Sequence, residues 1–303
     1  MDNINQQFLF SLAIILLGYI ARQKELIRQQ DSEGLSRIVF NITLPALIIT
    51  AFSQIEIDLS LMLLTFSGAF YGTLMLFLAL VIFRKEARTM RGMLSMCLPG
   101  FNIGLFAYPL VEVVWGHEGL KYFGMFDIGN SFVLLGLCYL VAGYFSPQSS
   151  GADLKMIIGK LLRSIPLLSY ITAFIIVVAG LRIPQPILGV TSMLAKANMP
   201  LSLLLLGFNL SFSMQPEYWR HMSKVIVLRY VIGAVVGASL YFLVPFEGLV
   251  RYTLLLGFLM PIGLSVIPFA VEFNYDQAFI GTMNNITILI SFALTWSIVG
   301  ALP

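Results

Sequence analysis

The stretch PGFNIGLFAYPL, from Pro99 to Leu110, lies inside a long apolar run that otherwise suits a membrane-spanning helix. Because proline lacks an N–H group and clashes with the turn before it, Pro109 is expected to free the carbonyl of Leu105. Gly104 loosens the same turn. Lipid cannot satisfy freed backbone groups, and irregular backbone persists at membrane depth only where protein buries it or where it lines a polar cavity. The stretch is therefore a candidate binding site.

The composition of the chain predicts an all-α, multi-pass membrane protein. Of its 303 residues, 58% are hydrophobic and only 11% are charged, proportions that a soluble domain with a charged surface does not reach. Ten apolar segments are each long enough, at roughly 20 residues, to span a bilayer. They cover residues 6–21, 35–53, 60–83, 92–115, 120–143, 156–180, 187–212, 223–245, 249–271 and 277–300. The first follows no Lys or Arg and precedes no small-residue cleavage site, so we expect a retained helix rather than a signal peptide.

Basic residues predict the orientation of these segments. They gather after the first, third, fifth and seventh segments, as Arg22, Lys24 and Arg28, then Arg84, Lys85, Arg88 and Arg91, then Lys155 and Lys160, then Arg220 and Lys224. The alternate loops are acidic or nearly neutral, so the positive-inside rule predicts a protein of the cytoplasmic (cell inner) membrane with both termini outside the cytoplasm. The net charge of +3 reflects this topology, and we expect no nucleic-acid partner.

A polar stretch divides the ten segments five and five. The residues YFSPQSSGADLK, at 144–155, are the most loop-like in the chain, which predicts a first five-helix repeat at 1–145, a cytoplasmic linker at 146–155 and a second repeat at 156–303. Because each half has an odd number of spans, the halves must have opposite orientations. The fold class expected is therefore ten transmembrane helices arranged as two inverted five-helix repeats.

Matching motifs support this repeat. GLFAYPL at 104–110 resembles GLSVIPF at 263–269, which makes Gly263 and Pro268 the counterparts of Gly104 and Pro109. Two further pairs occur in the same order: Pro45 with Pro200, and Asn130 with Asn285. Broken fourth and ninth helices that cross at the membrane midplane present helix N-termini to an anion and freed carbonyls to a cation. This arrangement is typical of a transporter.

The motifs also resemble a known family. The stretches GLSRIVFNITLPALI, FNIGLFAYPLVEVVWGHEGLKYFGMFDIGNSFVLL, MLAKANMPLSLLLLGFNLS and LMPIGLSVIPFAVEFNYD are similar to the auxin efflux carrier (AEC) family, which includes plant PIN proteins and bacterial malate and malonate permeases. The resemblance implies a scaffold of helices 1, 2, 6 and 7 and a mobile transport domain of helices 3–5 and 8–10. It also implies an elevator-type carrier of organic carboxylates. Ala107 departs from the glycine that is common there.

Polar residues inside the spans are the candidate site residues. A carboxylate deep in a span is costly enough to suggest function, so Asp127, with Asn130 on the same helical face, is expected to couple transport to H⁺ or Na⁺, and no other cofactor is expected. One acid with amides is a sparse sodium cage, which favours the proton. The alternative for Asp127 is a structural strut that is hydrogen-bonded to the broken backbone.

The expected substrate-binding residues lie around the two breaks: Asn102, Gly104, Pro109, Asn41, Pro45, Asn285 and Lys196, with Pro109, Gly263 and Pro268 at the crossover. Each has a structural alternative. Asn102 can cap the interrupted helix, Asn284 and Asn285 can bond between helices, and Pro45 alone is a kink. Lys196 can extend to the membrane surface, as Arg163 and Arg229 are expected to do.

Catalysis is not expected. An intramembrane aspartyl protease needs two carboxylates at one site, and a zinc site needs clustered His, Cys and acidic residues; the spans contain one deep acid. The expected partners are a small organic anion, the lipid bilayer and a second copy of the chain through the scaffold helices. A sodium-coupled carboxylate symporter and a membrane receptor for the same ligands remain alternatives.

Overall fold

The computed structural model describes residues 2–53, 58–147, 154–211, 216–243 and 248–301, and these are mainly helical. In this part of the chain the only β pairing is an isolated antiparallel bridge between Phe101 and Ile262. Residues 148–153 of the predicted linker lie outside the described residues.

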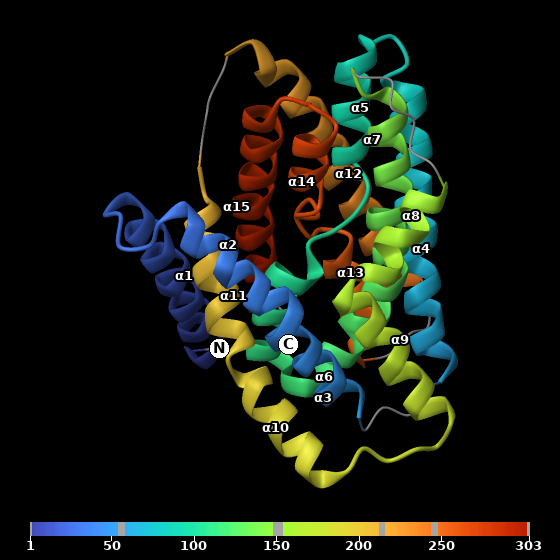
Figure 1. The fold of residues 1–303 in the computed structure, drawn as a ribbon. Coiled ribbons are helices and arrows are strands. Elements are labelled where there is room, and N and C mark those ends of the chain that lie inside the picture. The colour runs from blue at the N-terminus through green and yellow to red at the C-terminus, as the bar shows by residue number, and fades with distance from the viewer. Residues whose placement is uncertain (1, 54–57, 148–153, 212–215, 244–247, 302–303) are drawn as a thin grey trace.

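The helices follow the chain as shown in Figure 1. Those before the linker are α1 (Asp2–Gln23), α2 (Gln29–Ile38), α3 (Leu44–Phe52), α4 (Leu59–Ile82), α5 (Arg88–Cys97), α6 (Tyr108–Ser131) and α7 (Tyr139–Phe145). Those after it are α8 (Leu154–Arg163), α9 (Ile165–Val178), α10 (Gln185–Lys196), α11 (Asn198–Asn209), α12 (Trp219–Leu243), α13 (Gly248–Gly257), α14 (Val266–Glu272) and α15 (Gln277–Ala301). Three π-helical turns, η1 (Val39–Thr43), η2 (Ile103–Ala107) and η3 (Phe132–Cys138), and one 3₁₀ turn, η4 (Pro216–Tyr218), adjoin them.

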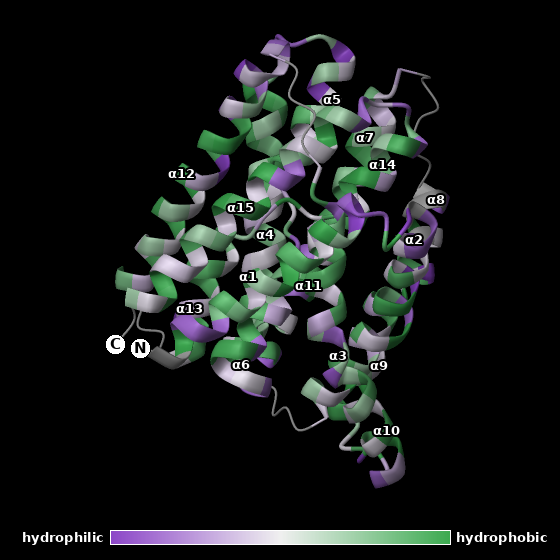
Figure 2. Cartoon of the chain, turned by 90° about the vertical axis from the view of Figure 1, so that its left-hand side faces the viewer, coloured by the Kyte–Doolittle hydropathy of each residue, from purple (hydrophilic) through white to green (hydrophobic). Residues whose placement is uncertain are grey.

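Seven helical stretches of the described chain are long and apolar enough to cross a membrane. They are Ile4–Gln23, Gln30–Phe52, Leu59–Ile82, Ile103–Phe145, Gln185–Asn209, Pro216–Leu243 and Gln277–Ala301, and two shorter apolar helices are Ile165–Val178 and Gly248–Gly257. Figure 2 shows hydrophobic residues along most of the helices, with many of the hydrophilic ones toward the ends of the molecule. These features are those of a multi-pass membrane protein.

The number of long apolar helices differs from the ten predicted segments because two segments join and two others are divided at particular residues. The fourth and fifth segments merge into one stretch that is kinked at Gly116, where φ is 59°, a conformation that glycine adopts without strain. The sixth is divided because Ser164 caps the start of α9 and Pro166 lies in its first turn. The ninth is divided between Gly257 and Val266.

Two helix interruptions meet inside the molecule. The first interruption (residues 98–102) separates α5 from η2 and includes Gly100, whose φ is +74°. The second interruption (residues 258–265) separates α13 from α14. They are joined by the bridge between Phe101 and Ile262 and by the backbone N–H of Asn102, which donates to the carbonyl of Pro261 at 2.9 Å. In Figure 1 the chain from α5 descends to the middle of the molecule, where this junction lies.

Small residues allow the surrounding helices to pack closely. Gly207 in α11 lies against the backbone of Ile15 in α1, and Gly129 in α6 lies against the backbone of Thr65 in α4. A Cβ atom at either glycine would overlap a carbonyl oxygen of its neighbour, so larger residues would force the helices apart. The α1–α11 and α4–α6 pairs are among the most extensive helix contacts.

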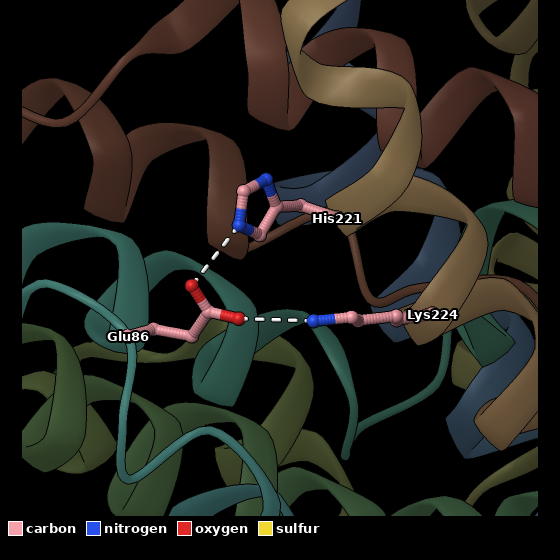
Figure 3. Close-up of polar contacts among 3 residues, drawn as sticks. All are labelled: Glu86, His221 and Lys224. Carbon is pink, nitrogen blue, oxygen red and sulfur yellow. Dashed lines mark hydrogen bonds and ion pairs between the residues drawn. The ribbon is translucent and has the colours of Figure 1, made fainter.

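An ion-pair cluster ties the turn between α4 and α5 to the start of α12. Figure 3 shows the carboxylate of Glu86 between His221 Nε2 and Lys224 Nζ, each 3.1 Å from one carboxylate oxygen. The Glu86 side chain is about a quarter exposed, at 24%. This cluster lies apart from the two interruptions in sequence and forms a separate contact between helices.

Candidate functional site

A cavity of about 290 Å³ lies beside the junction of the two interruptions. Its walls come from both interruptions and from η1, α3, η2, α6, η3, the end of α8 and the start of α9. The polar and charged residues that line it are Asn41, Asn102, Asp127, Ser131, Arg163, Ser164 and Ser265. The cavity therefore collects side chains from distant parts of the sequence around irregular backbone, as expected for a binding site in a membrane protein.

Asn102 both caps a helix and faces this cavity. Its Oδ1 accepts a hydrogen bond from the backbone N–H of Leu105 at 3.3 Å, which stabilises the first turn of η2. Its Nδ2 is buried and has no hydrogen-bond partner among the described residues. Because a buried, unpaired donor is costly, this amide is available to a ligand that carries an acceptor. The cap and the binding role predicted for Asn102 are thus compatible.

Asp127 contributes a buried carboxylate to the cavity. One carboxylate oxygen accepts from Asn130 Nδ2 at 2.8 Å and the other accepts from the Tyr170 hydroxyl at 2.9 Å. The same Asn130 amide holds the first interruption, because it donates to the Phe101 carbonyl at 2.9 Å and accepts from the Phe101 N–H at 2.8 Å. The Tyr170 hydroxyl also contacts that of Tyr108. Asp127 is therefore linked through Asn130 to the broken backbone.

Arg229 in α12 binds the backbone of both interruptions. Its side chain is 1% exposed and lies 4.5 Å from the centre of the Phe101 ring. The guanidinium donates to the carbonyls of Leu98 (2.6 Å), Gly100 (2.7 Å), Met260 (2.9 Å) and Pro261 (3.0 Å). The prediction that Arg229 extends to the membrane surface is wrong. The freed carbonyls of two chain segments instead satisfy its fork of donors inside the protein.

The second interruption is held by α15. Asn284 Nδ2 donates to the Ile262 carbonyl at 2.9 Å, and Thr287 Oγ1 accepts from the Ile262 N–H at 3.2 Å. The neighbouring Asn285 instead donates to the carbonyls of Asn209 and Ser211, at 3.4 and 2.5 Å. Asn285 is thus placed against the end of α11 and away from the cavity lining.

The other predicted residues divide between the cavity and its surroundings. Gly104 and Asn41 line the cavity. Pro109 and Pro45 are buried in the first turns of α6 and α3, and Gly263 is buried in the second interruption. Pro268 in α14 and Lys196 at the end of α10 are exposed, and neither belongs to the cavity lining.

A second cavity, of about 570 Å³, lies at another level of α3 and α6 and is also lined by α10. Along α3 the smaller cavity contacts Leu44 and the larger one contacts Thr50 and Ala51, with the fully buried Leu47 and Ile48 between them. Among the residues that line the larger cavity, Lys121 and Glu118 pair with each other at 2.6 Å. Packed apolar side chains therefore separate the two cavities.

The sequence interpretation missed several residues of the smaller cavity. Ser131 and Ser265 carry no signal, because single serines are common in apolar helices. Tyr170 lies outside the cavity lining and resembles an interfacial tyrosine, and only the fold brings its hydroxyl to Asp127. Arg163 was expected at the membrane surface; it is exposed at the end of α8 and also lines the cavity. Its position directly before the Ser164–Pro166 helix start was the available signal.

Comparisons with known proteins agree with this architecture. The model of the membrane transport protein family matches residues 4–299. An uncharacterized transporter of Methanothermobacter thermautotrophicus is 26% identical over 298 residues, which is 95% of each chain. An uncharacterized transporter of Methanocaldococcus jannaschii is 26% identical over 299 residues, which is 93% of this chain and 94% of the other. The chain therefore belongs to the membrane transport protein family, the auxin efflux carrier family that its motifs resemble, whose members are transporters rather than enzymes.

Proposed function

We propose that this protein is a secondary active transporter that moves a small organic carboxylate across the cytoplasmic membrane. The observation that carries the proposal is the cavity of about 290 Å³ beside the two interruptions, where Asn102 Nδ2 is buried without a partner. The long helix that begins at Ile103 directs the positive end of its dipole toward the same place. Arg229 adds a fixed positive charge behind Phe101. An anion is the ligand that these groups favour.

An elevator movement fits the helix packing. We assign α1, α2–α3, α8–α9 and α10–α11 to a scaffold and α4–α7 and α12–α15 to a transport domain, as two inverted repeats of five spans with both termini outside the cytoplasm. In support, α1 packs on α11, α3 packs on α9 and α10, and α4 packs on α6. The cavity lies between the two groups of helices, so sliding one past the other would carry a bound anion across the barrier at Leu47 and Ile48. We assign homodimer contacts to the scaffold.

Asp127 and Asn130 are the proposed coupling residues. A buried carboxyl group can take up a proton or ligate Na⁺ with nearby carbonyl and amide oxygens. The two hydrogen bonds to Asp127, from Asn130 and Tyr170, come from neutral groups, so among the described residues no positive side chain in contact with Asp127 competes with a cation. H⁺ remains the favoured coupling ion because the oxygen ligands for Na⁺ are few.

Reconstitution tests this function directly. Purified protein in proteoliposomes is expected to take up or exchange members of a panel of small carboxylates, with net uptake driven by a pH gradient and less by a sodium gradient. Flux that a sodium gradient alone drives would assign the coupling to Na⁺. Saturable binding without any flux would contradict transport and would indicate a receptor.

A further inference from the structure

Asn285 joins α15 to the end of α11. Its Nδ2 donates to the carbonyls of Asn209 and Ser211, at 3.4 and 2.5 Å, and the residue is 2% exposed. In Figure 1 this end of α11 lies next to α15. The last carbonyls of a helix have no partner inside it, so a buried amide that donates to them stabilises the contact between the two helices. Asn285 lies outside the cavity lining, and its amide therefore serves this helix contact.

The same end of α11 is also fixed to α1. Arg22 of α1 donates to the carbonyls of Phe208 and Leu210, at 3.2 and 3.3 Å, and lies 5.7 Å from the centre of the Phe208 ring. A positive charge at the C-terminal end of a helix is favourable. Helix α11 is thus held to α1 within the scaffold, whereas its bonds to α15 cross from the scaffold to the transport domain.

Other polar contacts of α15 differ from this one in what they join or in their exposure. The adjacent Asn284 donates to the carbonyl of Ile262 at 2.9 Å, which belongs to the same transport domain. Trp296 reaches the scaffold, because its Nε1 donates to Asn5 Oδ1 at 2.8 Å, but Asn5 is exposed and water can replace that bond. Asn285 therefore makes a buried polar contact between the two groups of helices.

We propose that Asn285 is a positioning residue for transport, a latch that holds the transport domain against the scaffold in the state that the structure describes. If α15 slides past α11 by one helical turn, about 5.4 Å, Nδ2 leaves the reach of both carbonyls, because a hydrogen bond needs a separation of about 3 Å. The latch must open in each transport cycle, and its strength helps to set the balance between this state and the next. This inference rests on the proposed function and names a contact that the movement breaks.

A reversible cross-link tests whether the contact opens. Ser211→Cys is combined with Asn285→Cys, while the native Cys97 and Cys138 are fully buried. Oxidation or a short bis-thiosulfonate reagent is expected to join the two introduced thiols and to stop carboxylate transport in proteoliposomes, and reductant is expected to restore it. Each single variant, treated in the same way, is expected to keep its rate. Transport that continues in the cross-linked pair, with the link verified by mass spectrometry, would overturn the latch.

Removal of the amide tests the balance between states. Spin labels at Glu33→Cys in the scaffold and Lys85→Cys in the transport domain, both at exposed positions, report the distance between the two groups of helices. Asn285→Ala is expected to raise the ratio of a second distance population to the first about tenfold, the loss of roughly one buried contact. Asn285→Leu, which keeps most of the side-chain volume, is expected to do the same. Asn284→Ala is the matched control and is expected to leave the ratio unchanged.

Three results would overturn the latch. They are equal distance distributions in Asn285→Ala and Asn284→Ala, a loss of thermal stability in Asn285→Ala without a shift in distance, and a loss of carboxylate binding in Asn285→Ala with unchanged distances. Carboxylate transport by the wild-type protein would survive each of them. If the wild-type protein neither binds nor transports any carboxylate, the proposed function itself fails, whatever the distances show.

Discussion

The two helix interruptions adjoin matching sequence motifs, at residues 104–110 and 263–269, but differ in the polar groups that they leave unpaired. At the first interruption Asn130 satisfies both backbone groups of Phe101, and Asn102 keeps a free donor beside the cavity. At the second, Asn284 and Thr287 satisfy the backbone of Ile262. The unpaired group there is an acceptor, Asn284 Oδ1, which is fully buried and outside the cavity lining.

This difference indicates that the two interruptions have different roles. A free donor that lines a cavity attracts an anion, whereas an interruption whose backbone is satisfied by a neighbouring helix serves mainly to position its partner segment. Leu264 and Ser265 still bring the second interruption to the cavity wall. We therefore expect changes at the first interruption to alter transport, and changes at the second to alter stability.

The largest effect is expected at Arg229, which both interruptions share. Arg229→Met removes the donors of at least four buried carbonyls. At about 0.6 to 1.5 kcal/mol for each lost bond, the destabilisation is roughly 2 to 6 kcal/mol. Thermal unfolding in detergent, followed by size-exclusion chromatography, measures it. Arg229→Lys should recover only part, because an ammonium group lacks the planar fork.

The control for this comparison is Arg220→Met, which removes an exposed arginine from the same helix. It is expected to change the unfolding temperature little. If Arg229→Met is as stable as the control, the guanidinium does not hold the two interruptions together, and the distinction between them must have another origin.

A paired substitution separates the two interruptions. Asn102→Ala is expected to reduce transport at least tenfold, while the lost helix cap costs only about 1 kcal/mol of stability. Asn284→Ala leaves the Ile262 carbonyl unpaired and is expected to cost about 1 to 3 kcal/mol of stability, with transport per folded molecule largely retained. Both quantities are measured on the same proteoliposome preparations. The opposite pattern would reverse the roles assigned to the two segments.

Local rules predicted the first interruption, and tertiary contacts decided the rest. The prolines and glycines between Pro99 and Pro109 predict a break in an apolar span, and Asn102, Gly104 and Asp127 were therefore expected close to it. Arg163 and Arg229 could not be told apart, because both are basic residues near the end of an apolar segment. Only the positions of distant carbonyls distinguish them.

The repeat pattern illustrates a second limit. Sequence alignment pairs Asn130 with Asn285, but the contact that corresponds to the Asn130–Phe101 bond is made by Asn284. Successive residues of a helix point about 100° apart, so an error of one position selects a side chain on another face. Motif spacing identified the correct helix, α15, but not which of its faces contacts the second interruption.

Asp127 gives a smaller, condition-dependent effect at the first interruption. Asp127→Asn keeps the shape of the side chain but removes its charge. If Asp127 carries the coupling proton, the variant is expected to lose the pH dependence of net transport and to keep substrate exchange. If it ligates Na⁺, the variant should instead need more sodium, with an unchanged pH response. Uptake under separately imposed proton and sodium gradients distinguishes these outcomes.

Tyr170→Phe is the matched control for Asp127, because it removes one hydrogen-bond donor from the carboxylate and leaves the charge. It is expected to change the coupling less than Asp127→Asn does. Coupled transport by Asp127→Asn that equals the wild type under both gradients would show that this carboxylate is only a structural strut for Asn130 and Phe101.

The smallest effect is expected at Glu86. Its contacts lie outside both interruptions, so the stability change at Glu86 is a reference for the changes expected at the interruptions. Hydrogen bonds from Lys224, and then from His221, hold the pKa of Glu86 below its usual value of 4.5. The folded state therefore favours the ionised carboxylate, and this contribution to stability is complete above pH 4.5 and is lost as the pH falls through the lowered pKa. Because the pair is partly exposed, its contribution at neutral pH is expected to be below about 1 kcal/mol.

Glu86→Gln should consequently unfold at a slightly lower temperature than the wild-type protein at pH 7, and the difference should shrink on acidification below pH 4.5. Glu33→Gln, at an exposed acid in α2, is the control that should show no such trend. A difference that persists or grows in acid would exclude the ion pair as its cause. A loss as large as that of Arg229→Met would mean that a peripheral contact stabilises the fold as much as the junction of the interruptions does.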